Sequence, residues 1–221
     1  MWTLRVMVLV VMLLLMTRGQ AAATLFSSRS AWESEILADS IARPGATAIY
    51  DLNLAAQVPD LGTLSAGSRI MTPLGRFLFF GIPLTGRQVP SSWPSWSGGN
   101  TPRVLYTDTE ASLAAIFADA GPVYAFGFEV EPEVGVQQFT FRADDGTSLT
   151  QSVSSDGGAA FFGFSDGLFR DWTLSCDTCI GSGFAVGRFV IAAPMPGALT
   201  LFILGLVGLA GTQAFRARRR N

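Results

Sequence analysis

The stretch VYAFGFEVEPEVGVQQFTFRADDGTSLTQSV, from Val123 to Val153, decides the fold class. Large apolar residues alternate with small or polar ones in Val123–Glu131 and again in Val136–Arg142, which is the period of a strand with one buried face. Asp144-Asp145-Gly146 separates the second run from a third, Ser148–Val153. Because an Asp-Gly pair accepts the positive φ angles of tight turns, the stretch predicts a hairpin of antiparallel strands.

Similar short runs recur on both sides, separated by Gly, Pro, Asp and Ser. Thr109–Asp119 also has helical propensity, but a Gly-Pro turn joins its second half to the next alternating run, which favours a strand there. Many short strands with turns at regular intervals predict a mainly β fold, a single β-sandwich of the jelly-roll or lectin-like kind. The further strands are expected at Ala46–Leu52, Arg76–Ile82, Val104–Tyr106, Leu113–Ala118, Ala160–Phe164, Phe169–Ser175 and Phe184–Ala192.

One short α-helix is expected near the N-terminal end of this domain. Ser30 and Glu33 have the spacing of a capping box, and Arg43-Pro44-Gly45 ends the helical pattern. The apolar residues at helical spacing, expected to face the sheet, are Trp32, Ile36, Leu37 and Ile41.

Charge is distributed unevenly along the 221 residues. Six of the 15 basic residues stand at the two ends, which leaves nine against 17 acidic residues and a net charge of −8 for the central segment. A domain with this charge repels phosphate backbones, so we expect no nucleic-acid partner. The chain has no His and no Lys, which excludes Ser-His-Asp and Cys-His catalysis and lysine Schiff bases.

The N-terminus has the composition of a secretory signal peptide. Arg5 is followed by the unbroken apolar run Val6–Met16, and Ala21-Ala22-Ala23 fits a small-residue cleavage site. The run is shorter than the about 20 residues of a transmembrane helix. We therefore expect residues 1–23 to be removed on export, with an uncleaved anchor as the alternative.

The C-terminus, residues 194–221, combines a proline motif, an apolar run and a basic cluster. An uncharged run at Ala198–Phe215 has about the length that spans a bilayer, so a transmembrane helix is expected at 198–215. The arginines after it stay in the cytoplasm by the positive-inside rule, which places the domain at 24–193 outside. The motif residues are Pro194, Met195, Pro196 and Gly197, and the cluster is Arg216, Arg218, Arg219 and Arg220.

This segment resembles the PEP-CTERM sorting signal over Pro194–Arg220, and it departs at Met195, where the family has Glu. The resemblance implies processing by an exosortase-type enzyme in a Gram-negative bacterium, and association with exopolysaccharide and biofilm. An ordinary single-span anchor is the alternative. The pieces Pro122–Phe128, Asp144–Gly146 and Phe161–Phe164 also resemble ectodomains often attached to such tails, although Val186–Phe189 replaces their Ile-Asp-Asn-type motif.

Cys176 and Cys179 form the only cysteine pair. Two cysteines without histidine do not complete a zinc site, and no βαβ context surrounds them for a redox motif. In an oxidising compartment we expect a small disulfide that closes a turn between strands.

Glu129, Glu131 and Glu133 stand at alternate positions, so on one strand they share a face. We expect this face to be solvated. A calcium site that uses the turn residues Asp144, Asp145 and Asp156 and a glycosidase pair of carboxylates are the weaker alternatives, and we predict neither a bound metal nor another cofactor.

The segment Trp93–Asn100 places Trp93 and Trp96 in a Pro/Ser/Gly context. Exposed aromatic rings in a polar loop suit stacking on sugar rings. A loop that folds back to cover the open end of the sandwich is the other interpretation, and the sequence favours it.

The sequence therefore predicts an exported, non-enzymatic protein of the cell envelope, outer surface or extracellular matrix, with a membrane-anchored precursor. Its expected role is structural or adhesive, with weak polysaccharide binding through Trp93 and Trp96 as a further hypothesis. The alternative is a periplasmic binding module that the C-terminal helix anchors permanently in the inner membrane.

Overall fold

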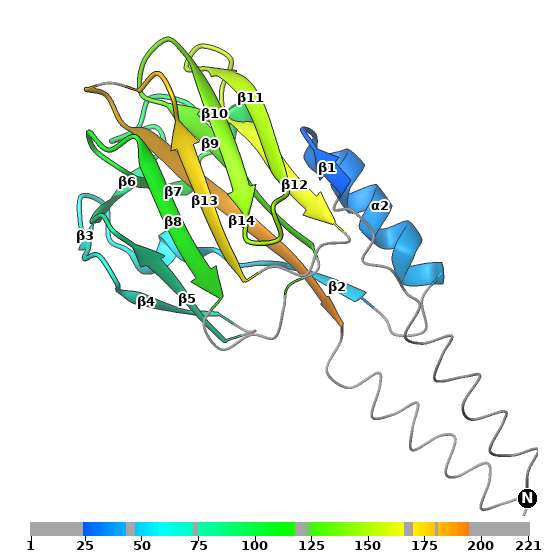
Figure 1. Cartoon of the computed structure of the whole chain (residues 1–221). Coiled ribbons are helices and arrows are strands. Elements are labelled where there is room, and N and C mark those ends of the chain that lie inside the picture. The colour runs from blue at the N-terminus through cyan, green and yellow to red at the C-terminus, as the bar shows by residue number, and fades with distance from the viewer. Residues whose placement is uncertain are drawn as a thin grey trace, which may run out of the picture.

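The computed structural model describes residues 24–42, 47–72, 75–117, 123, 125–165, 170–179 and 181–194. Two antiparallel sheets face each other (Figure 1). The eight-stranded sheet has the order β1 (Thr24–Phe26), β12 (Ala160–Ser165), β9 (Ala125–Pro132), β14 (Phe184–Pro194), β7 (Arg103–Tyr106), β6 (Leu84–Gln88) and β3 (Thr63–Leu64), and β2 (Thr47–Asp51) also pairs with β14. The six-stranded sheet has the order β11 (Ser148–Ser154), β10 (Val136–Ala143), β13 (Asp171–Cys176), β8 (Ser112–Phe117), β5 (Gly75–Phe80) and β4 (Arg69–Thr72).

The space between the sheets is filled mainly by aromatic side chains. Phe128 of β9 stacks on Trp172 of β13, with ring centroids 5.0 Å apart, and on Phe162 of β12 at 5.8 Å. All three side chains are fully buried. Aromatic rings remove more apolar area from water than any other side chain of one strand position, so this stack is the centre of the hydrophobic core.

Helix α2 (Arg29–Ala42) packs on the outer face of the eight-stranded sheet (Figure 1). Trp32 is buried there against Phe161, and its indole N–H donates to the Phe164 carbonyl at 2.8 Å. Gly127 and Gly163, the glycines of the AFGF and FFGF segments, leave the room that the Phe161 ring occupies, because a Cβ at either position would overlap it. These glycines are therefore packing positions.

The strands predicted from alternating runs are all present, and their ends differ from the predicted ends by at most two residues. Thr109–Asp119 contains a strand, and Asp144–Gly146 forms a turn with Gly146 at φ 87°. The helix prediction is correct in place but wrong in two details. Ser28, not Ser30, caps the helix, because its hydroxyl accepts from the Ala31 N–H at 3.5 Å, and Leu37 faces solvent.

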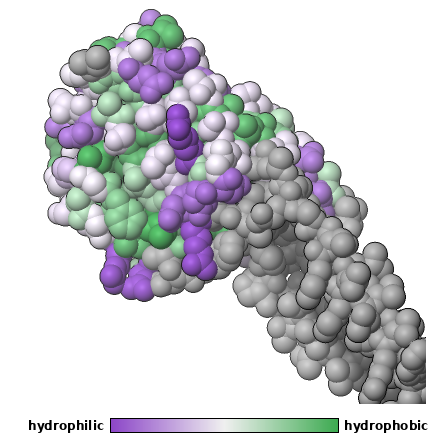
Figure 2. Space-filling view, viewed as in Figure 1, coloured by the Kyte–Doolittle hydropathy of each residue, from purple (hydrophilic) through white to green (hydrophobic). Residues whose placement is uncertain are grey.

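The outer faces of the two sheets differ. Besides α2, the loop Val89–Pro102, here called the covering loop, buries part of the eight-stranded sheet. The outer positions of the six-stranded sheet are exposed or half-buried in the structure apart from Thr140. Figure 2 shows this side, where hydrophilic and hydrophobic residues are mixed.

Within these described ranges, no helix is both long and apolar enough to cross a membrane. The predicted helix at 198–215 lies outside them, as does the predicted signal peptide at 1–23. β1 begins at Thr24, and β14 continues through Pro194, one residue past the predicted domain end.

Candidate functional site

The eight-stranded sheet is interrupted beside β14. β7 pairs with the first part of this strand and β2 with its last part. The register of β14 against β9 shifts between Gly187 and Val190, so Arg188 and Phe189 stand at a bulge opposite the break between β7 and β2. A bulge of this kind commonly re-aims a side chain next to a functional site.

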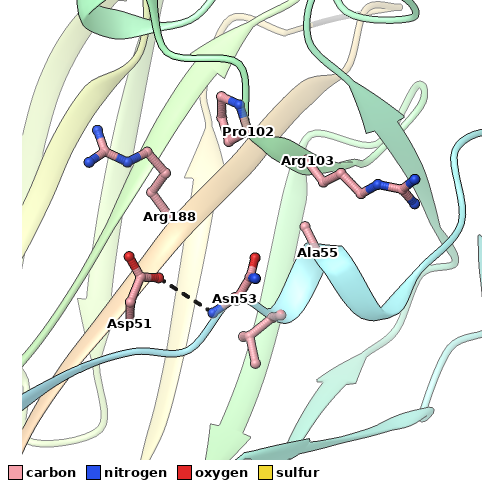
Figure 3. A pocket seen from close by; sticks show the side chains of 7 residues that line it. Asp51, Asn53, Ala55, Pro102, Arg103 and Arg188 are labelled. Carbon is pink, nitrogen blue, oxygen red and sulfur yellow. Dashed lines mark hydrogen bonds between the residues drawn. The ribbon is translucent and has the colours of Figure 1, made fainter.

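A pocket of about 430 Å³ lies at this break (Figure 3). Its residues come from the end of β2, the short 3₁₀ helix η1 (Leu54–Gln57) and the residue before it, the end of the covering loop, the start of β7 and the bulge. In Figure 3 the Asn53 side chain points into the space between Asp51 and Ala55, while Pro102 lies across from it. The pocket is lined by Asp51, Asn53, Leu54, Ala55, Pro102, Arg103 and Arg188.

Two of these lining residues have left-handed backbone conformations that favour glycine. Asn53 has φ 36° and Arg188 has φ 47°. Asn tolerates this region better than most residues, whereas a long side chain there costs of the order of 1–3 kcal/mol. Backbone strain of this kind often accumulates at binding sites, where the surrounding structure holds it in place.

The polar groups of the pocket differ in how they are already used. The Asp51 carboxylate accepts from the Asn53 N–H at 3.4 Å and lies 3.6 Å from the Arg29 guanidinium. Arg188 donates to Glu129 at 2.9 Å. Among the described residues none hydrogen-bonds to the Asn53 side-chain amide, and Asn53 is exposed, so it has both a donor and an acceptor available to a ligand.

The covering loop closes one side of the site and buries both predicted tryptophans. Trp93 and Trp96 are each only 4% exposed and pack against Val104, Tyr106 and Ala185. The premise that these rings are exposed for stacking on sugars is therefore wrong. The loop folds back over the domain, as the other interpretation of the sequence expects. It covers the outer face of the eight-stranded sheet, however, and not the open end of the sandwich.

The predicted solvated acidic face is also wrong for two of its three glutamates, because the covering loop lies over them. Glu129 is 3% exposed, and its carboxylate accepts from Trp96 Nε1 at 2.5 Å and Ser97 Oγ at 3.1 Å, besides Arg188. A buried charge needs such partners to offset its desolvation. Glu129 therefore joins the loop to the bulge at the pocket.

Glu131 is buried next to it with fewer partners. Ser95 Oγ donates to Glu131 Oε1 at 2.5 Å, while Glu131 Oε2 and Trp93 Nε1 are both buried without a hydrogen bond of acceptable geometry. Desolvation by burial raises the pKa of the Glu131 carboxyl, and the nearby hydroxyl of Ser95 and indole N–H of Trp93 offset part of that rise. Trp93 Nε1 thus lies close enough to influence the carboxylate without bonding to it well.

Glu133, the third of the row, is exposed and accepts from the Tyr106 hydroxyl at 2.6 Å. Burial, and then the bond to Glu133, raise the pKa of Tyr106. The three alternating glutamates therefore differ in environment, from Glu129, which is buried and hydrogen-bonded, to Glu133, which lies at the surface.

The pH dependence of stability provides a test of the Glu131 environment. A carboxyl whose folded pKa is raised binds its proton more tightly in the folded state, so its contribution to stability is present at acidic pH and is lost as pH rises through the raised value. We expect Glu131→Gln to remove this loss. The free energy of unfolding of the variant, relative to that of the wild type, should therefore be higher at pH 7 than at pH 4.5. Urea unfolding of both proteins across that range measures the difference, and a constant difference at every pH would contradict it.

The remaining predicted residues lie away from the pocket. Cys176 and Cys179 are joined by a disulfide at the end of β13, with Cα atoms 5.4 Å apart. Asp144, Asp145 and Asp156 are exposed, and among the residues with assigned positions no group of three or more His, Cys, Asp or Glu could hold a metal ion. The sorting residues Met195, Pro196, Gly197, Arg216, Arg218, Arg219 and Arg220 lie outside the described ranges.

No family model matches the chain, and no curated protein matches it. Solved structures of family 29 carbohydrate-binding modules do match. A variant module aligns at 8% identity over 66% of this chain and 91% of its own, with a TM-score of 0.36, and a module from Piromyces equi aligns at 9% over 66% and 90%, with 0.35. At these scores the matches carry no argument about this chain's ligand.

Proposed function

We propose that this protein is an exported, non-catalytic β-sandwich that binds a saccharide in the pocket at the sheet break. It acts at the cell envelope or in the extracellular matrix, in a structural or adhesive role linked to exopolysaccharide or biofilm. The C-terminal segment that resembles PEP-CTERM directs its processing by an exosortase-type enzyme. The resemblance supports the sorting, and the pocket supports the binding.

The observation that carries the binding proposal is the composition of the pocket. Asn53 offers an amide and Asp51 a carboxylate, which are suited to hydroxyl groups. Pro102, which is half-buried, offers apolar surface to the C–H groups of a sugar ring, and the nearly buried side chains of Leu54 and Ala55 complete the apolar lining. Ligand sites commonly combine apolar lining with a few polar groups that fix orientation, and this pocket has the volume of a small-molecule site.

The position of the domain ends suits a tethered precursor. Thr24 pairs with Ser165, and the strand registers place this pair level with Ala192, close to the end of β14. The two ends of the domain therefore lie at the same end of the eight-stranded sheet. The covering loop contacts Glu129 and Glu131, so on the outer face it lies over the half of β9 farther from these ends.

Asn53→Gly tests the binding function without threatening the fold. Glycine accepts φ 36° without strain, so the stability of the variant should equal or exceed that of the wild type. Loss of the amide should weaken retention on the host's own polysaccharide by about tenfold, the value of one net hydrogen bond of about 1–1.5 kcal/mol. Affinity electrophoresis of the purified protein measures this.

Asn100→Ala is the matched control, because Asn100 is an exposed amide outside the pocket. It should migrate in the polysaccharide gel as the wild type does. Equal retention of Asn53→Gly and wild type would move the ligand away from this pocket, and no retention of the wild type would refute saccharide binding.

A further inference from the structure

Arg103 is the one pocket cation among the described residues that has no carboxylate partner. It is half-buried, and its Nη1 donates to the Val58 carbonyl at 2.8 Å. A carbonyl accepts a hydrogen bond but does not neutralise the guanidinium charge. In a central segment of net charge −8, a half-buried arginine without an acidic partner is unexpected on electrostatic grounds.

The other charges of the site are paired. Arg188 donates to Glu129 at 2.9 Å, and Arg29 lies 3.6 Å from Asp51. Arg29 also bonds Glu33 at 2.7 Å, so the cluster of Arg29, Glu33 and Asp51 carries no surplus positive charge. Arg103 is therefore the lining guanidinium whose charge no carboxylate partner neutralises. A guanidinium presents five N–H donors in a planar fork, and the bond to Val58 uses Nη1 alone.

The geometry separates this charge from the hydroxyl-binding groups. Figure 3 shows the Arg103 side chain extending from the Pro102 side past Ala55, while Asp51 lies on the opposite side of the pocket and Asn53 between them. A ligand that spans the pocket therefore meets a carboxylate and an amide at one end and a guanidinium at the other.

We infer that the pocket recognises an acidic sugar, a saccharide unit whose carboxylate is bound by Arg103 while its hydroxyls bond to Asp51 and Asn53. This inference rests on the proposed saccharide binding and specifies its ligand class. Arginine is suited to this role because its fork matches the two oxygens of a carboxylate. A neutral sugar would leave the guanidinium unpaired beneath the ligand, which is unfavourable.

The experiment compares two forms of one ligand by titration calorimetry with the intact protein. The first is a short oligogalacturonate, and the second is the same oligomer with its carboxylates methyl-esterified. Short oligomers limit repulsion from the acidic surface, and at 0.15 M salt such repulsion is screened beyond about 8 Å. We expect the wild type to bind the acidic form about 10- to 100-fold more tightly, the range for a hydrogen-bonded charged group.

Arg103→Gln should abolish this preference by weakening the acidic form alone. Arg103→Lys retains the charge without the fork and should keep part of the preference. Asn53→Gly should weaken both forms equally, since its amide bonds to hydroxyls. Arg69→Gln, an exposed arginine on β4 of the other sheet, is the control and should bind both forms as the wild type does.

Each outcome decides between the two proposals. Equal binding of both forms by the wild type overturns the acidic-sugar inference and leaves saccharide binding intact. Equal weakening of both forms by Arg103→Gln shows that Arg103 acts only by holding the Val58 carbonyl, which also overturns the inference. Binding of neither form, together with no retention on the host polysaccharide, refutes the proposed function itself.

Discussion

Replacing Glu129 with alanine is expected to destabilise the protein by about 3 kcal/mol, because it breaks a buried ion pair by removing one partner. The carboxylate accepts from Trp96, Ser97 and Arg188. Without it, the Trp96 indole N–H remains beneath the covering loop with no acceptor, and Arg188 loses its carboxylate partner. We expect a lower urea midpoint, and faster tryptic cleavage after Arg87 and Arg103, which flank the loop.

Glu133→Ala is the matched control, at the residue that directly follows β9. Glu133 is exposed and accepts from the Tyr106 hydroxyl and, at 3.4 Å, from the Gly183 N–H. Its loss should cost less than about 1 kcal/mol, because water replaces these bonds at the surface. If the two variants unfold at the same urea concentration, Glu129 does not hold the covering loop in the way that its contacts indicate.

Phe128→Ala should have an effect at least as large, of about 3–5 kcal/mol. Its ring lies between Trp172 and Phe162, in stacked geometry with both. Removing it leaves a cavity between two sheets that cannot close without shifting strands, so both the transfer free energy and the packing contacts are lost. Urea unfolding monitored by circular dichroism gives the value.

Phe80→Ala provides the comparison for this core substitution. Phe80 is on β5 of the six-stranded sheet, and 43% of the residue is exposed. We expect a loss of less than about 1 kcal/mol, since little apolar area returns to water. A loss comparable with that of Phe128→Ala would show that the outer face of this sheet is also covered.

The strands with clear alternation could be predicted because each buries one face in the core. Phe126 and Phe128 face inward on β9, while Gly127 faces α2, and period-two patterns of this kind survive in the sequence. β1, β3, β4 and β6 were not predicted. They are two to five residues long, and β1, β3 and β4 stand at sheet edges, where burial imposes less of a pattern.

The candidate site was harder to predict because it depends on contacts between distant segments. The alternating glutamates of β9 have the pattern of a solvated face, and only the covering loop, more than 30 residues earlier, makes Glu129 a buried partner of Trp96. One signal was present. Two tryptophans in a loop with Ser95 and Ser97 need partners for their indole N–H groups when buried. Glu129 supplies one to Trp96, whereas Trp93 Nε1 has none.

No local pattern in the sequence indicates the pocket. It arises because β7 and β2 share one side of β14, and the bulge at Arg188 falls between them. Asn53 and Arg188 have no distinctive neighbours in sequence, and their positive φ angles follow from this long-range arrangement. Strand order and bulges of this kind are tertiary properties, so the ligand-binding residues were not predicted.

Intact mass and C-terminal peptide mapping of the protein recovered from its native host test the central claim most directly. The account predicts a chain that starts near Thr24 and ends between Pro194 and Gly197, found in the envelope or the surrounding matrix. A chain that retains Phe215 and the terminal arginines, found in the inner membrane, would contradict it. The C-terminal segment would then be a permanent anchor, and the domain a periplasmic binding module.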